Sequence, residues 1–200
     1  MILVFRRIGQ RRYAIEAKRP KFPDVEMNPA PGYDRWMPHD LLHLVVEAQL
    51  GLTRGVFGQL AAGGDAGTFH PSFEPHERPR VAARVRHRLQ ARGKTLMREG
   101  RDQSAQSERA TYICWYEWLT RSQSGDRRTA AQVMTQQARQ VRDVAPAMEL
   151  RALSERKLAE ICQHLDELSS HWSRLEVGES MAVRWPDLAV SASPAVLMSE

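Results

Sequence analysis

The chain has 200 residues, of which 42% are hydrophobic and 26% are charged, and its formal net charge is +5. This length suits a single domain with its own core, and the composition is that of an ordinary globular protein. No apolar stretch approaches the roughly 18 residues that a membrane-spanning helix needs, so we expect no membrane partner.

Cysteine usage and the amino terminus indicate a cytoplasmic protein. Cys114 and Cys162 lie far apart in helix-like stretches, which makes a disulfide framework improbable and favours two thiols in the core. The first residues, MILVFRRIGQ, place an apolar run before the arginines, which is the reverse order of a secretory signal.

The amino-terminal third of the chain predicts a β-hairpin, a linker and a helix. Residues 2–8 and 11–18 are rich in branched and aromatic side chains and flank Gly9 and Gln10, which suit a two-residue turn. Four prolines between residues 19 and 36 exclude regular helix and predict extended chain or turns. Pro38 then favours the start of a helix that ends at Gly51.

The remaining sequence is mostly helical in its spacing of apolar residues. We expect helices over 55–64, 80–99, 107–121, 128–145 and 158–175, then a strand near 181–185 that joins the hairpin. The predicted fold is therefore α+β: a mostly helical single domain, residues 1–190, with a small antiparallel sheet made from the amino-terminal hairpin and a carboxy-terminal strand. Residues 191–200 are predicted to be a flexible tail.

The stretch MPHDLLHLVVE is the main candidate for chemistry. Positions four apart lie on one helical face roughly 6 Å along the axis, so His39 and His43 are candidate ligands of one divalent ion, with Zn²⁺ the expected metal. Asp40 takes the place of the glutamate that normally accepts a proton from metal-bound water, and it is the candidate catalytic residue of a metal-dependent hydrolase.

Glu47 lies too far along a straight helix to share that ion with His39, and we expect it instead to accept the free N–H of His43 and hold its tautomer. The alternative interpretation is that His39 and His43 only make hydrogen bonds at the start of a helix. A further ligand would come from elsewhere in the chain, and the candidates include His70, His76, Glu108, Glu117, His164 and His171.

Two resemblances rest on these residues. The block W-x-P-H-D-L-x-H-x-V-V-E, together with VGESMAVRWP near the end and the basic first hairpin, resembles a group of uncharacterised bacterial proteins of similar length. That resemblance implies a shared fold over most of the chain and no particular activity. HDLLH is also similar to the HDxxH zinc signature of the Coq-four family of ubiquinone-biosynthesis scaffold proteins. That family places a glutamate after eleven further residues, where this chain has Gly55.

A non-enzymatic role is the alternative function. Arg80, Arg84, Arg88 and Arg92 are predicted to line one edge of a helix, where they would meet the phosphates of a nucleic acid, although no aromatic residue is interleaved for base stacking. Such a stripe is also typical of a solvated face paired with acidic neighbours. The apolar seam from Leu158 to Leu175 suits either the chain's own core or a protein partner. Apart from nucleic acid, which is not the favoured partner, the expected partner is a small molecule or a protein.

Overall fold

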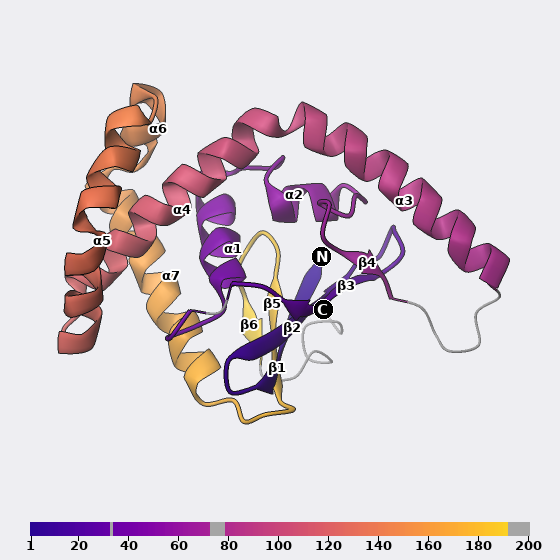
Figure 1. Cartoon of the computed structure of the whole chain (residues 1–200), viewed down its shortest axis with the longest axis horizontal. Helices are drawn as coiled ribbons and strands as arrows, with labels where there is room; N and C mark the ends of the chain where they lie inside the picture. The colour runs from indigo at the N-terminus through magenta and orange to yellow at the C-terminus, as the bar shows by residue number, and fades with distance from the viewer. Residues whose placement is uncertain (33, 73–78, 192–200) are drawn as a thin grey trace.

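The computed structural model describes residues 1–32, 34–72 and 79–191, and it confirms the α+β fold (Figure 1). One antiparallel sheet has the strand order β4-β3-β2-β1-β5-β6. The amino-terminal hairpin and the carboxy-terminal strand pair as predicted, because β5 lies directly beside β1. The strands are β1 (Ile2–Gly9), β2 (Arg12–Lys18), β3 (Val25–Ala30), β4 (His70–Pro71), β5 (Ser180–Arg184) and β6 (Val190–Ser191).

The sheet differs from the sequence-based expectation at the hairpin turn and in three strands that were not predicted, β3, β4 and β6. The hairpin turn comes one residue later, because Gly9 pairs with Arg12. Residues 25–30, expected as linker, form strand β3 in spite of Pro29. Ile15 pairs with Met27 and Tyr13 with Ala30, so β3 carries one extra residue over this interval. Such a bulge accommodates a proline that has no N–H to give to the ladder.

The helices follow the predicted order, with one short addition before the last. α1 ends at Gly51, whose φ of 65° is the left-handed conformation that glycine adopts readily. They are α1 (His39–Leu50), α2 (Val56–Ala61), α3 (Pro79–Glu99), α4 (Arg101–Arg121), α5 (Gly125–Val144), α6 (Ala147–Ala152) and α7 (Glu155–Ser173). None of the helices in the described ranges combines the length and apolar character that crossing a bilayer requires.

The core joins the inner face of the sheet to α1, α2, α4 and α7. Leu3, Phe5 and Ile15 from the strands are fully buried in one cluster with Leu42 and Val45 of α1. The apolar seam of α7 belongs to the same cluster, so it serves the chain's own core and does not provide a partner surface. Both cysteines are buried free thiols.

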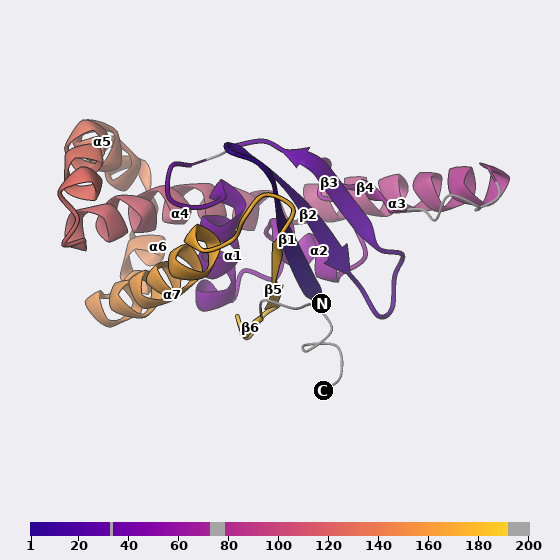
Figure 2. The ribbon, with the colours of Figure 1, turned by 90° about the horizontal axis from the view of Figure 1, so that it is seen from below.

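α3 stands apart from this packing. In the two views its amino-terminal end extends well beyond the sheet and the other helices (Figures 1 and 2). Only Leu89 and Gly93 of its 21 residues are buried. Most of the helix is therefore available to solvent or to a partner. The predicted tail lies outside the described residues from 192 onward, and Ser191 belongs to β6.

Candidate functional site

The sequence-predicted site lies along the side of α1 that faces α4. His39 and Asp40 form its first turn, and His43 and Glu47 follow on the next turns. Both later residues are buried: the His43 side chain is 8% exposed, and Glu47 has no exposed surface. Buried polar groups of this kind need hydrogen-bond partners, and α2 and α4 supply them.

Glu47 joins three helices through its carboxylate. Its Oε1 accepts hydrogen bonds from the Val56 N–H at 2.8 Å and from the Ser107 hydroxyl at 2.9 Å, while Oε2 accepts from the Phe57 N–H at 2.9 Å. The carboxylate thus satisfies the free N–H groups at the start of α2, where the helix dipole also favours negative charge. Burial dominates over these hydrogen bonds and raises the pKa of Glu47 to about 7.

The same hydroxyl continues the network to His43. The Nδ1 atom of His43 lies 3.1 Å from the Ser107 Oγ and 3.3 Å from the Thr111 Oγ1. When Glu47 is ionised, Ser107 donates its single proton to that carboxylate, and the Ser107 oxygen then accepts a hydrogen bond from Nδ1–H of His43. In this state the imidazole proton lies on Nδ1, and Nε2 keeps its lone pair.

His43 is neutral near physiological pH. Burial, with a smaller contribution from the neighbouring His39, lowers the pKa of His43 to about 3. Its Nε2 atom lies 3.8 Å from Oε2 of Glu108, whose side chain is 71% exposed. A neutral imidazole cannot form an ion pair with this carboxylate. The Nε2 lone pair of His43 and the Glu108 carboxylate are therefore two hydrogen-bond acceptors that face each other.

The rings of His39 and His43 lie together, with centroids 4.8 Å apart and planes at 71°, and His39 also stands against Trp115 at 6.1 Å. Asp40 is directed elsewhere, because its Oδ2 accepts a hydrogen bond from the Tyr13 hydroxyl of β2. Burial raises the pKa of Asp40. A role as proton acceptor would require this hydrogen bond to break.

Of the other candidate ligands, only Glu108 approaches the histidine pair in the interactions of the described residues. Glu117 forms ion pairs with Arg121 and Arg142, and His164 pairs with Glu167. His70 lies in β4, and His76 lies outside the described residues. Within the described ranges, no three or more His, Cys, Asp or Glu side chains are arranged to hold a metal ion. The metal roles of His39 and His43 stay predictions.

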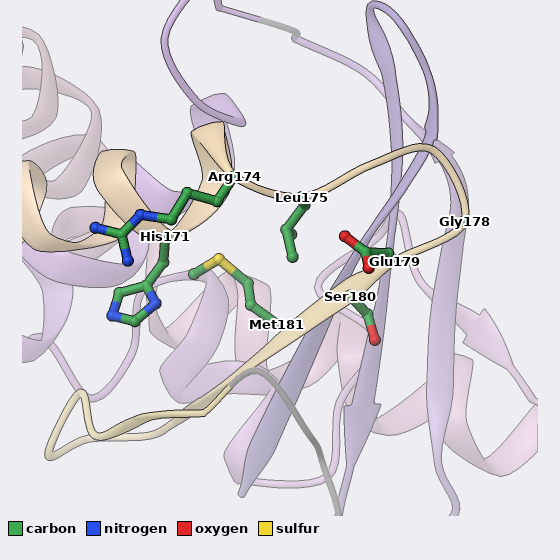
Figure 3. Close-up of a pocket in the computed structure, with 7 residues that line it drawn as sticks. All are labelled: His171, Arg174, Leu175, Gly178, Glu179, Ser180 and Met181. Carbon is green, nitrogen blue, oxygen red and sulfur yellow. The ribbon is translucent and has the colours of Figure 1, made fainter.

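A separate cavity of about 540 Å³ lies between the end of α7 and the start of β5. His171 and Met181 line it together, while Arg174 turns back along α7, away from Glu179 (Figure 3). The polar groups of this cavity do not converge on a common point, which a binding or catalytic constellation requires.

α3 is the second sequence-predicted site, and its charge is almost all of one sign. Its basic side chains are all exposed, and Arg80, Arg84, Arg88 and Arg92 follow one edge at steps of roughly 6 Å. No ion pair between described residues involves this helix, whereas Arg109, Arg121, Arg127 and Arg142 of the helical layer are all paired. The seven basic residues are Arg80, Arg84, Arg86, Arg88, Arg92, Lys94 and Arg98, against the single acidic Glu99.

Sequence reasoning missed the residues that connect the site. Ser107 and Thr111 lie more than sixty positions after His43, and nothing in their local pattern marks them. Gly55 is explained only by the structure: a Cβ atom there would lie 2.3 Å from the Glu47 carboxylate. The sequence predicts a direct hydrogen bond from His43 to Glu47. In the structure the two side chains are instead connected through the Ser107 hydroxyl.

In comparisons with known proteins, no family model, curated protein or solved structure matches the chain.

Proposed function

We propose that this protein binds nucleic acid through the phosphate backbone, with α3 as the contact helix. The observation that carries the proposal is where the charge lies. α3 alone has a net charge of +6, from seven basic residues and one acidic residue, while the whole chain has +5. All remaining residues together sum to −1, so the positive excess belongs to one protruding helix.

Two further features support a phosphate partner. The arginines of α3 make no ion pair with any described residue, so binding a polyanion would not first require breaking such a pair. Arginine also presents a planar group with several donors that suits phosphate oxygens. A stripe at successive helical turns would meet successive phosphates, and contacts of this kind bind without reading sequence.

The test is binding of a fluorescently labelled oligonucleotide at low salt, followed by anisotropy. The variant Arg80→Gln/Arg84→Gln/Arg88→Gln removes three charges from the stripe, and we expect it to bind at least tenfold more weakly than the unmodified protein. The control Arg11→Gln/Arg139→Gln/Arg151→Gln removes three exposed charges outside α3 and should bind nearly as well. Equal losses in both variants, or no binding by the unmodified protein, would refute the proposal.

A second candidate, which the His43 network favours, is a divalent-metal site at His39 and His43, with a metal-dependent hydrolase as the activity. Support comes from Nδ1–H of His43, whose hydrogen bond to Ser107 leaves the Nε2 lone pair facing Glu108. The side chains of the described residues do not form a three-ligand cluster as they lie, so the exposed Glu108 would have to turn toward the ion.

This candidate is tested by metal analysis of protein purified without a histidine tag. Bound zinc should be lost in both His39→Ala and His43→Ala, and it should be retained in His164→Ala, which changes a histidine on α7. The same metal content in all four proteins would eliminate the site.

A further inference from the structure

A groove runs beside the arginine stripe of α3. It has a volume of about 320 Å³ and lies between α3 and the turn that joins β2 to β3. Its apolar lining comes from Phe22 and Pro23 of the turn and from Val85 and Leu89 of the helix, and its charged lining comes from Arg88 and Arg92. This volume is near the lower end of ligand sites, which are roughly 300–1,000 Å³, so the groove suits a small group.

The lining combines a planar surface with positive charge. The guanidinium of Arg92 lies over the Phe22 ring, 4.7 Å from its centroid, and its Nε donates a hydrogen bond to the Ala62 carbonyl at 2.6 Å. Arg92 is therefore held in place as part of a stacked pair. Aromatic rings and arginine planes are the two surfaces on which nucleic-acid bases stack in proteins.

The folded chain thus supplies the aromatic residue that the helix itself lacks. Phe22 comes from a turn more than fifty residues before α3, so it cannot be recognised from the helix sequence. Arg88 belongs both to the groove and to the stripe, with Arg84 one turn away. A phosphate bound at Arg84 and Arg88 would place the base of the same nucleotide next to the groove.

From these contacts we infer that the groove takes an unpaired base, and that the nucleic acid bound by α3 is single-stranded. This inference rests on the proposed function. In a duplex the bases are stacked and paired inside the helix, so their flat faces cannot enter a groove of this kind. Stacking of one base contributes a factor of about 5 to 150 in affinity.

The experiment compares three labelled probes of equal length at one low salt concentration: oligothymidylate, a strand with the same phosphates but no bases, and a duplex. We expect oligothymidylate to bind at least fivefold more tightly than the strand without bases, and more tightly than the duplex. The variant Phe22→Leu keeps an apolar side chain and should reduce the preference for oligothymidylate over the strand without bases.

The outcomes separate the two proposals. Equal affinity of the unmodified protein for oligothymidylate and for the strand without bases would overturn the groove inference and leave phosphate binding intact. Tighter binding of the duplex would overturn it as well. No binding to any of the three probes would overturn the proposed function itself. The comparison of probes needs only the unmodified protein, so it holds even if Phe22→Leu fails to fold.

Discussion

Gly55→Ala tests the hydrogen-bond network that joins α1, α2 and α4. The backbone at Gly55 has φ −70° and ψ −169°, which alanine adopts without strain, so the effect of the substitution should be steric. The added Cβ would lie 2.3 Å from both Cδ and Oε1 of Glu47. Because that distance is far below van der Waals contact, the carboxylate must move.

The expected loss of stability follows from the hydrogen bonds that the displaced Glu47 carboxylate would lose. It accepts two backbone N–H groups at the start of α2 and the Ser107 hydroxyl. Hydrogen bonds to charged groups contribute about 1.5–3 kcal/mol each, and losing one or two of them should reduce the free energy of unfolding by about 2–4 kcal/mol. In a chain of this size that corresponds to a fall in Tm of about 5–15 °C.

Urea denaturation of a double-mutant cycle isolates the contact. In the Glu47→Ala background there is no carboxylate to collide with, so Gly55→Ala should cost only about 0.5 kcal/mol there, as at an ordinary helix start. Gly125→Ala, where a Cβ meets nothing within 4 Å, serves as the control and should be nearly neutral. A cost below about 1 kcal/mol for Gly55→Ala in the unmodified chain, or an equal cost in both backgrounds, would refute the reasoning.

Two other predictions concern the same network. Ser107→Ala removes the hydroxyl shared by His43 and Glu47 and should reduce the free energy of unfolding by about 1–3 kcal/mol. The control Ser173→Ala, at the exposed end of α7, should change the free energy of unfolding by less than about 0.5 kcal/mol. Similar values for the two variants would contradict the network. The second prediction concerns pH. Because the pKa of Glu47 is raised, the native state binds more protons than the unfolded state between pH 4.5 and about 7, so the free energy of unfolding falls as pH rises through this range. Relative to Glu47→Gln, the unmodified protein should therefore lose on the order of 2 kcal/mol across that range in urea titrations, and a constant difference would show that the pKa is not raised.

The elements that sequence predicted well have strong local signals. The hairpin has branched residues on both sides of a glycine, and α7 repeats apolar residues at three and four positions over about five turns. α1 carries a proline before its first residue and a glycine after its last. In each case the pattern that identifies the element lies within it or at its ends, although the apolar seam of α7 packs against distant parts of the chain.

Apart from the pairing of β5 with the amino-terminal hairpin, the sequence did not predict the contacts between distant segments. Pro29 argues against a strand, and only the extra residue in β3 shows how the ladder tolerates it. His43 and Glu47 were recognised from helical spacing, but Ser107, which connects them, comes from another helix. Phe22 and Arg92 likewise meet only in the folded chain. The side chains of the candidate site could thus be named from periodicity, while their partners required the tertiary structure.

The salt dependence of oligonucleotide binding tests the central claim most directly. If the four arginines of the stripe each neutralise one phosphate of a single strand, log K should fall with log[salt] at a slope of about −2.8, a loss of about 50-fold between roughly 50 and 200 mM salt. In Arg80→Gln/Arg84→Gln/Arg88→Gln one contact remains, and the slope should fall to about −0.7. A slope near zero for the unmodified protein, or the same slope in both proteins, would contradict the assignment of phosphate binding to α3.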